Sequence, residues 1–423
     1  MPDLTTNCAG IISPNPFWLA SAPPTNSGSQ IMRAFDAGWG GAVWKTLGAE
    51  VQNVSSRFGA LHTANQRGVG FTNIELISDR PLQSSFREIA EVTKKYPNNA
   101  VIISLMVETR DEWKDIIKRS IDAGADGLEL NFGCPHGMCE RGMGSAVGQE
   151  PAVNEEITAW AVDYSTVPVL AKLTPNVGDI IPHGLASQRG GAHGVSLINT
   201  IKSIIGVDID KFVPLPAVSG AGTNGGYCGE AVRPIALHMV SQLSKCPDFG
   251  IPISGIGGVA NWRDAVEFLL LGASSVQVCT EVMLRGYRVV EDMIDGLEEY
   301  MRSHDFETID QMVGKAVSQV SDWGHLDLNY ETVAKIDADT CIGCQLCLVA
   351  CMDASHQCIH PNPNGTRVPI VDEPECVGCN LCEIVCPVPG CVTMVEVDNG
   401  FEPATWNEFN DGGKQLRSKK GSH

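Results

Sequence analysis

The sequence has 423 residues and a mass of 45.3 kDa, which is enough for one large domain and a smaller one. Its formal net charge of −20 argues against nucleic acid or an anionic membrane surface as partners, because both attract Lys and Arg. No apolar run approaches the roughly 18 residues that span a bilayer, and the N-terminus lacks the pattern of a signal peptide. We therefore expect a cytoplasmic protein that binds neither nucleic acid nor membrane.

Eight short apolar runs alternate with longer amphipathic stretches over the first 300 residues. Segments such as 263–272, which ends at Gly, have the apolar spacing of a helix. Eight strand–helix units predict an α/β fold of the (β/α)8 TIM barrel type. The alternative is a doubly wound open sheet, but the turn after the first run lacks the glycine pattern of that fold. The expected strands are 17–21, 42–46, 100–106, 127–131, 168–173, 194–198, 252–256 and 275–279.

A barrel of this kind carries its catalytic residues at the carboxyl ends of the strands, so we expect functional polar side chains to concentrate there. Glycines after the seventh run suit a phosphate group, because they let backbone N–H groups approach it, and residues 225–234 are expected to add more amides. A GxGxxG pattern within 220–225 does not lie between a strand and a helix, which argues against a dinucleotide site. Residues at the strand ends are Lys45, Thr46, Asn131, Lys172, Asn199, Thr200, Gly257, Gly258, Cys279 and Thr280.

Ten of the 16 cysteines lie between Cys341 and Cys391. Residues 341–351 and 376–386 both have the spacing C-x2-C-x2-C-x3-C, which is typical of two-cluster bacterial ferredoxins. In that pattern the fourth Cys of each run binds the other cluster. Structural zinc is the alternative, although its usual ligand spacing differs. The spacing predicts two 4Fe–4S clusters, one on Cys341, Cys344, Cys347 and Cys386, the other on Cys376, Cys379, Cys382 and Cys351. We expect the remaining Cys358 and Cys391 to pack near the clusters rather than to bind them.

Clusters move single electrons, so a cluster domain joined to a phosphate-binding barrel predicts a cofactor that handles both one and two electrons. FMN, with one phosphate, fits a barrel rim, whereas FAD would need a dinucleotide fold. We expect an FMN-binding barrel over 1–300, a helical linker over 301–335, a small α+β ferredoxin-like domain over 336–400 and a C-terminal tail over 401–423. The end of this tail, from residue 407, is expected to be loose or to dock a partner.

The segments LASAPPT, WKTLG, FTNIELIS, LNFGCPHG, AKLTPN, INT, GGYCGEAVRPIAL, SGIGG and VQVCT, followed by the two cysteine runs, carry a family resemblance. The chain resembles the FMN and iron–sulfur subunits of bacterial NAD-dependent dihydropyrimidine dehydrogenases. Its barrel is more distantly similar to dihydroorotate dehydrogenases. The resemblance implies a cytoplasmic oxidoreductase that reversibly reduces uracil and thymine. It also implies a partner subunit with FAD, an NAD site and further clusters, assembled as a heterotetramer.

The same resemblance implies roles for matching residues. Cys134 resembles the catalytic acid, and Lys45 and Lys172 resemble residues that hold the flavin ring. Relatives often have Ser where this chain has Gly133, so a hydrogen bond to the substrate is expected to be lost or replaced by water. The residues that resemble pyrimidine contacts are Asn73, Asn131, Asn199 and Thr200. Those that resemble the FMN cradle are Ala20, Ser21, Thr46, Gly229, Gly257, Gly258, Cys279 and Thr280.

Elementary chemistry supports these roles. Reduction of an activated C=C bond needs a hydride on one carbon and a proton on its neighbour. A thiol, whose ordinary pKa is about 8.5, can donate that proton and accept it in the reverse direction. Cys134 begins a glycine-rich loop, 134–148, that we expect to close over the substrate, and His136 and Cys139 on this loop are rival acids. Two other functions stay open: reduction of another substrate such as orotate, or an electron-transfer subunit with an inactive barrel.

Overall fold

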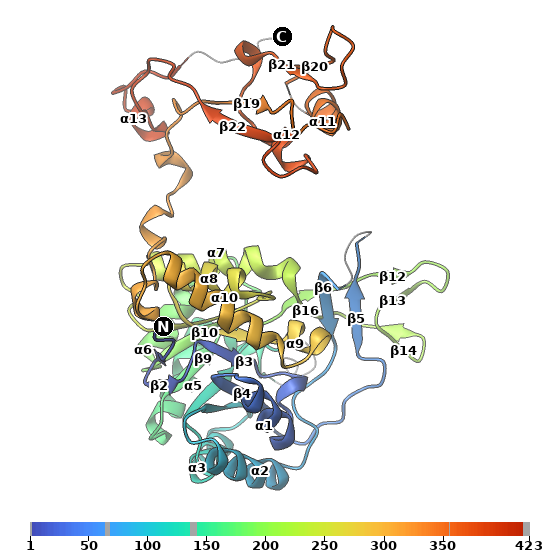
Figure 1. Ribbon diagram of the computed structural model, residues 1–423. Coiled ribbons are helices and arrows are strands. Elements are labelled where there is room, and N and C mark those ends of the chain that lie inside the picture. Colours follow the sequence, from blue (N-terminus) through green and yellow to red (C-terminus); the bar gives the residue numbers. More distant parts are fainter. Residues whose placement is uncertain (1, 64–67, 136–141, 355, 418–423) are drawn as a thin grey trace. The chain divides into compact units, whose positions relative to one another are not determined.

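The computed structural model describes residues 2–63, 68–135, 142–354 and 356–417 (Figure 1). The chain divides into two compact units, Met1–Val320 and Ser321–His423. Among the helices that the described residues form, none combines the length and the apolar character needed to cross a bilayer.

The first unit is built on a closed barrel of eight parallel strands. Each strand pairs with the next one in chain order, and the last pairs with the first, where Val276 lies opposite Phe17. The predicted TIM barrel is confirmed, and the ends of its strands differ from those predicted by at most two residues. The strands are β3 (Phe17–Leu19), β4 (Gly41–Gly48), β7 (Ala100–Met106), β8 (Gly127–Asn131), β9 (Val169–Lys172), β10 (Gly194–Leu197), β17 (Ile253–Ile256) and β18 (Ala273–Val278).

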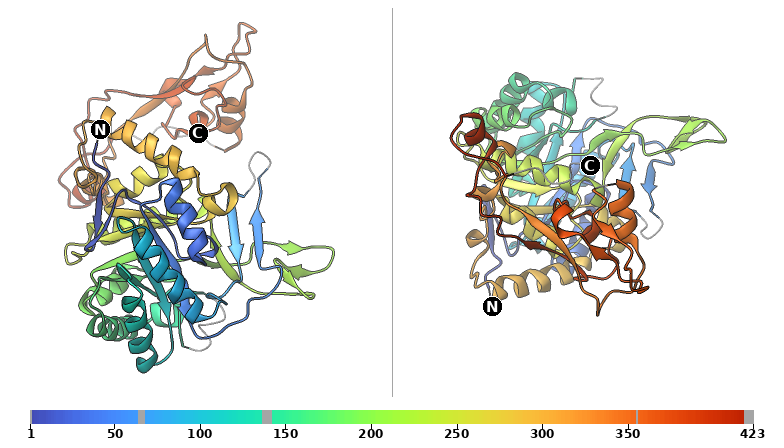
Figure 2. Two further views of the ribbon diagram at one scale, coloured as in Figure 1. Left: turned by 60° about the horizontal axis from the view of Figure 1, so that its bottom comes forward. Right: turned by 90° about the horizontal axis from the view of Figure 1, so that it is seen from above.

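Helices surround the strands (Figures 1 and 2). The helix α3 (Arg110–Asp122) shows why these segments are helical. Thr109 Oγ1 accepts from Glu112 N while the Glu112 carboxylate accepts from Thr109 N, and this pair of hydrogen bonds caps the first turn. Its apolar face buries Trp113 and Ile117 in the core. The helices are α1 (Gly28–Ala37), α2 (Leu82–Lys95), α3 (Arg110–Asp122), α4 (Ser145–Gly148), α5 (Pro151–Tyr164), α6 (Ile181–Arg189), α7 (Arg233–Lys245), α8 (Trp262–Leu270), α9 (Thr280–Arg285) and α10 (Val289–Ser303).

Two smaller β elements accompany the barrel. One is the N-terminal hairpin of β1 (Thr6–Cys8) and β2 (Ile11–Ser13). The other is an antiparallel sheet in the order β11 (Ile201–Ser203), β16 (Gly225–Cys228), β6 (Gly70–Asn73) and β5 (Phe58–Leu61).

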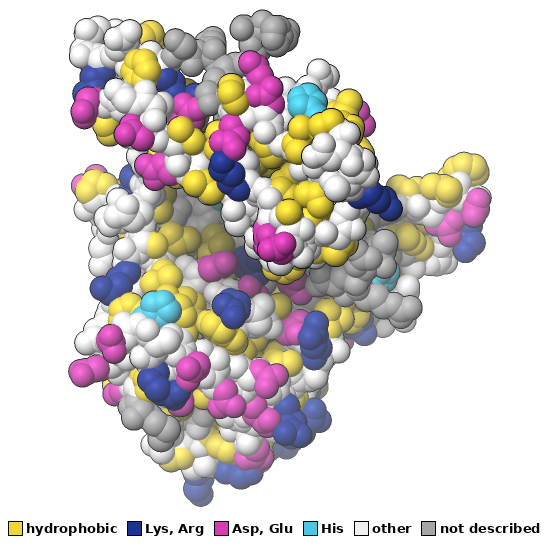
Figure 3. Space-filling model, turned by 45° about the horizontal axis from the view of Figure 1, so that its top comes forward, with side chains coloured by type: hydrophobic (Ala, Val, Ile, Leu, Met, Phe, Trp, Pro, Cys, Tyr) yellow, Lys and Arg dark blue, Asp and Glu magenta, His cyan; other side chains and the backbone are white. Residues whose placement is uncertain are grey.

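The chain between β11 and β16 forms an arm that projects from this sheet and exposes hydrophobic side chains (Figure 3). The GxGxxG pattern falls in this arm and in β16, so it forms no strand–turn–helix unit, as predicted. The arm contains β12 (Val207–Asp208), β13 (Val213–Pro214), β14 (Ala217–Val218) and β15 (Ala221–Gly222).

The second unit is a small α+β domain. β19 (Thr332–Ile336) pairs antiparallel with β22 (Val392–Glu396), and β20 (Ile359–His360) pairs with β21 (Ile370–Val371). The helices α11 (Leu346–Ala354) and α12 (Leu381–Ile384) carry three cysteines of the two runs. Its core joins apolar side chains such as Val333 and Val392 to four cysteines of the runs.

The segment predicted as a helical linker has little regular helix. Within 301–335 the described residues form the end of α10, the start of β19 and the single 3-10 turns η4 (Ile309–Gln311), η5 (Val317–Gln319) and η6 (Trp323–His325). Ile309 and Met312 belong to the barrel core. The domain boundaries at 300 and 335 therefore stay predictions.

The C-terminal segment is held against the second unit up to residue 417. It contains α13 (Trp406–Asn410). Asn329 Nδ2 donates to Gln415 O at 3.0 Å, and Arg417 N donates to Asn329 Oδ1 at 2.8 Å. These contacts hold the described end of the segment against the second unit, and docking of a partner by this tail stays a prediction.

Candidate functional site

Two adjoining cavities lie at the carboxyl ends of the barrel strands. The larger has an open volume of about 940 Å³, and the two share Cys228, Ile256, Gly257 and Cys279 in their walls. The structure brings all fifteen residues predicted for the barrel site to these walls. The larger cavity is lined by Ala20, Ser21, Lys45, Thr46, Asn73, Asn131, Cys134, Lys172, Asn199, Thr200, Gly257 and Cys279. The smaller one adds Gly229, Gly258 and Thr280.

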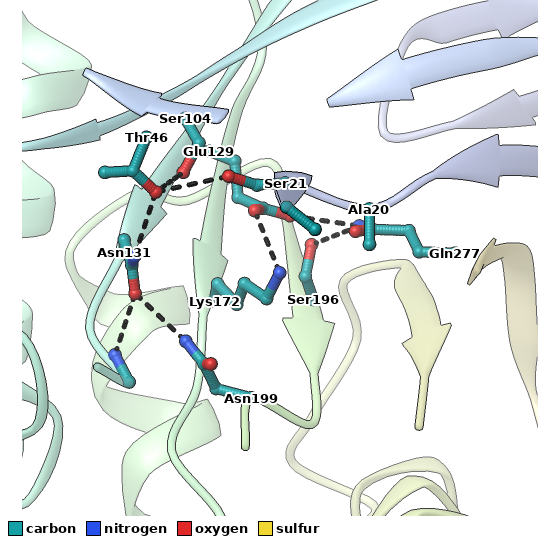
Figure 4. A network of polar contacts seen from close by, with 12 residues as sticks. Ala20, Ser21, Thr46, Ser104, Glu129, Asn131, Lys172, Ser196, Asn199 and Gln277 are labelled. Carbon is teal, nitrogen blue, oxygen red and sulfur yellow. Dashed lines mark hydrogen bonds and ion pairs between the residues drawn. The ribbon is translucent and has the colours of Figure 1, made fainter. Parts of the chain in front are cut away.

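Lys45 and Thr46 lie where the pairing of β4 with β7 shifts its register. Such an irregularity re-aims side chains, here at the end of a barrel strand. Thr46 Oγ1 accepts a hydrogen bond from Asn131 Nδ2 at 3.0 Å (Figure 4). The same oxygen lies 2.9 Å from Ser104 Oγ and 3.2 Å from Ser21 Oγ. One hydroxyl group therefore links residues of four neighbouring barrel strands or the turns that follow them.

Asn131 and Asn199 contact each other directly. Asn199 Nδ2 donates to Asn131 Oδ1 at 2.9 Å, and Gly133 N donates to the same oxygen at 3.2 Å (Figure 4). A Cβ added at Gly133 would lie 2.3 Å from the Asn199 Cβ. Asn199 thus occupies the space that a side chain at position 133 would need, so a Ser there would require Asn199 to move.

Each lysine of the site pairs with a carboxylate. Lys45 Nζ lies 2.9 Å from Glu75 Oε1, which also accepts from Arg57 Nη1 at 2.9 Å. Lys172 Nζ lies 3.3 Å from Glu129 Oε1 (Figure 4). Neither acidic residue is predicted from the sequence as part of the site. The signal for them was an acidic residue within an otherwise apolar stretch, in NIELIS and GLELN.

The barrel interior below the site is polar, so polar side chains are not concentrated at the strand ends alone. Gln277 Nε2 lies 3.0 Å from Glu129 Oε2 and 3.1 Å from both Ser196 Oγ and Ser254 Oγ (Figure 4). Glu129 Oε1 and Gln277 Oε1 are buried without a hydrogen bond among the described residues, although the former faces the Lys172 ammonium. The lysine therefore meets a buried negative charge inside the barrel.

Three cysteines line the larger cavity: Cys134, Cys228 and Cys279. Burial raises the pKa of Cys228 to about 11. Burial also raises the pKa of Cys279, with a smaller contribution from the nearby Cys228. Both of these cysteines therefore remain thiols near neutral pH.

Cys134 lies at the start of its loop against a small apolar cluster that contains Ile77 and Met143. Its carbonyl accepts from Ser145 N at 3.0 Å. Gly144, at φ +59°, passes so close that an added Cβ would lie 3.0 Å from the Cys134 Cβ. A glycine is thus needed beside this cysteine. The rival acids His136 and Cys139, and with them the middle of the predicted lid, lie outside the described residues.

The smaller cavity has a glycine-lined wall. Gly229, Gly257 and Gly258 have φ values of +92°, +136° and +78°. A Cβ added at Gly258 would lie 2.7 Å from Gly229 O, so side chains could not be accommodated there. Exposed backbone of this kind suits a phosphate, and the larger cavity beside it suits a ring system. Glu281 also lines this cavity, and its carboxylate pairs with Arg285 at 2.8 Å. The two cavities together fit FMN.

In the second unit, one small cavity gathers the four residues predicted for the second cluster, including the ligand contributed by the first run. Among the described residues, no three His, Cys, Asp or Glu side chains are grouped closely enough to hold a single metal ion. The four cysteines are Cys351, Cys376, Cys379 and Cys382.

The two cysteine runs also share one backbone conformation. Gly343 and Gln345 have φ values of +67° and +64°, and Gly378 and Asn380, at the same places in the second run, have +73° and +57°. These left-handed residues let each loop curl around a compact group. The residues present therefore fit two 4Fe–4S clusters.

Comparison with known families agrees with the division of the chain into a barrel and a cluster domain. The model of the dihydroorotate dehydrogenase family matches residues 3–301, and that of the 4Fe-4S dicluster domain matches residues 334–394. The NAD-dependent dihydropyrimidine dehydrogenase subunit PreA of Escherichia coli (strain K12) is 42% identical over 397 residues, which cover 93% of this chain and 96% of that protein.

Two further relatives cover less of the chain. The chloroplastic dihydropyrimidine dehydrogenase (NADP(+)) of Arabidopsis thaliana is 42% identical over 340 residues, 77% of this chain and 79% of that protein. The catalytic subunit of dihydroorotate dehydrogenase B (NAD(+)) of Pyrococcus horikoshii is 37% identical over 308 residues, 73% of this chain and 96% of that protein.

Proposed function

The chain belongs to the dihydroorotate dehydrogenase family, and from this membership we propose that it reversibly reduces the 5,6 double bond of uracil and thymine. It is an oxidoreductase whose cofactors are FMN and two 4Fe–4S clusters. The observation that carries the proposal is that a thiol, three Asn side chains and two lysines converge on one cavity of this barrel.

When bound, FMN supplies the hydride and the clusters supply single electrons. The glycine-lined wall would hold the phosphate of FMN, and Lys45 and Lys172 would stabilise negative charge on its ring. The strands exclude water from the deep side of the site, since Glu129 and Lys172 are each buried.

The chain's own residues would bind the pyrimidine and move its proton. Asn73, Asn131 and Asn199 each offer a donor and an acceptor, which matches the alternating C=O and N–H edge of the ring, and Thr200 adds a hydroxyl. Cys134 Sγ would donate a proton to the carbon next to the one that receives the hydride, and take it back in the reverse reaction. Burial raises the pKa of Cys228 and of Cys279, which makes both thiols weaker proton donors, so the step is assigned to Cys134.

Reduction of orotate is the second candidate, because the family and one relative are named for dihydroorotate. The extent of the alignments favours pyrimidine bases. The dihydroorotate relative aligns over 73% of the chain, whereas the dihydropyrimidine relative aligns over 93% and so includes the cluster domain.

The Escherichia coli relative is named as a subunit, which supports a partner for this chain. We propose that the partner oxidises NAD(P)H at FAD and passes electrons through the clusters in a heterotetramer. Location in the cytoplasm stays a prediction from the sequence.

Anaerobic visible spectroscopy tests the activity. The purified chain is reduced chemically, excess reductant is removed, and uracil, thymine or orotate is added. We expect uracil and thymine to restore the flavin and cluster absorbance rapidly. Reoxidation by orotate alone would replace the proposal with the second candidate.

The variant Cys134→Ala tests the proton donor. We expect it to keep FMN and iron but to slow reoxidation by uracil by about 10²- to 10⁴-fold, the usual contribution of a general acid. Cys246→Ala is the matched control, because Cys246 lies at the end of α7 and lines neither cavity. Near-normal reoxidation of Cys134→Ala would remove Cys134 from the mechanism.

A further inference from the structure

One buried thiol lies beside the second group of cluster ligands without belonging to it. Cys358 lines the same small cavity as Cys351, Cys376, Cys379 and Cys382. Its exposed fraction is 4%, and its Sγ lies 3.6 Å from the Sγ of Cys351, within hydrogen-bonding distance for sulfur. The cavity therefore holds a fifth sulfur in contact with one of the four predicted ligands.

The direction of this hydrogen bond follows from the chemistry of ligation. A Cys that binds iron does so as a thiolate and has no proton to donate. Cys351 is the ligand that the first run contributes to the second cluster. The proton between the two sulfur atoms then belongs to Cys358.

The backbone keeps the thiol of Cys358 in place. Cys358 comes directly before β20, in which Ile359 pairs with Val371. Its carbonyl accepts from Asp372 N at 2.7 Å. The side chain is thus attached to a paired strand rather than to a free loop.

Cys391 is the counterpart of Cys358 in the second run and provides a natural control. It comes directly before β22, its exposed fraction is 2%, and its carbonyl accepts from Asp337 N at 2.8 Å. Its thiol, however, donates to the carbonyl of Asp337 at 3.7 Å. Its side chain also interacts with Cys386, a predicted ligand of the first cluster, so the two extra cysteines adjoin different clusters.

We propose that Cys358 donates an S–H···S hydrogen bond to the ligand thiolate of Cys351 and thereby raises the reduction potential of that cluster. Hydrogen bonds to the sulfurs of a cluster draw charge from it and stabilise its more negative, reduced form. Cys358 makes this contribution to the cluster ligated by Cys351. The inference rests on the crossed ligand assignment and not on the identity of the substrate.

An anaerobic redox titration of the full chain, followed by EPR, tests the proposal. We expect Cys358→Ala to keep all eight iron atoms of two 4Fe–4S clusters and to shift one cluster midpoint to lower potential while the other stays. Cys358→Ser retains a donor and should keep that midpoint above the one in Cys358→Ala. Cys391→Ala, the matched control, should leave the midpoint of the cluster ligated by Cys351 unchanged.

A vibrational measurement separates the hydrogen bond from a packing effect. The Fe–S(Cys) stretching bands in the resonance Raman spectrum should shift in D2O for the unsubstituted chain, and that shift should shrink in Cys358→Ala. Unchanged midpoints in Cys358→Ala would overturn the proposal. So would the loss of half the iron, because Cys358 would then be a ligand. No pyrimidine is added in either experiment, so a failure of uracil to reoxidise the chain leaves this inference standing.

Discussion

The two lysines of the barrel site differ in how their acidic partners are held. Glu129, the partner of Lys172, is completely buried inside the barrel, where Gln277 also donates to it. Glu75, the partner of Lys45, lies at the rim and is shared with Arg57, whose side chain is 32% exposed. One positive charge of the site is therefore fixed by the strands that enclose it. The other belongs to a chain of charges that reaches solvent and can adjust.

Of the substitutions that test this comparison, Glu129→Gln should lower the free energy of unfolding most. It leaves the Lys172 ammonium inside the barrel without its counter-charge, and breaking a buried pair in this way costs about 3–5 kcal/mol of the free energy of unfolding. Urea denaturation followed by FMN fluorescence reports on the barrel unit and gives the change in midpoint at constant m-value.

The double variant Glu129→Gln with Lys172→Met is the control for this experiment. Removing both charges should recover part of the lost stability, because the second change removes the unpaired ammonium. If Glu129→Gln alone cost less than about 1 kcal/mol, the deep pair would behave like a surface pair and the comparison would fail.

The pair of Glu129 and Lys172 could not be predicted from the sequence. The strands could be predicted, because eight apolar runs of suitable length recur along the chain, and residues at their carboxyl ends must meet on one rim. The contact of Glu129 with Lys172 depends on how β8 and β9 pair, with Glu129 opposite Leu170 and Asn131 opposite Lys172. A five-residue run such as GLELN does not reveal that register or which face turns into the barrel.

The same limit applies elsewhere in the molecule. The cysteine runs could be identified because the ligands of such clusters are separated by only two or three residues in the sequence. The packing of Asn199 over Gly133 and of Cys358 on Cys351 could not, since each joins segments whose distance in space is set by the whole fold.

The substitution Glu75→Gln should have an intermediate effect. Lys45 loses a charged partner, but the amide oxygen that remains can still accept from Lys45 and Arg57. We expect a loss of about 1–3 kcal/mol in the free energy of unfolding, measured by the same urea titration. A loss as large as that for Glu129→Gln would show that the rim pair is as rigidly enclosed as the deep one.

The substitution Arg57→Met should have the smallest effect. Its guanidinium is partly exposed, so its attraction to Glu75 is screened by water, and pairs of this kind contribute at most about 1 kcal/mol. The effect should shrink further when the urea titration is repeated in high salt, because salt screens exposed charges. The change for Glu129→Gln should be nearly independent of salt. A salt-independent loss above about 2 kcal/mol in Arg57→Met would mean that Arg57 is needed to hold Glu75 against Lys45, and the two lysines would then be supported by equally rigid partners.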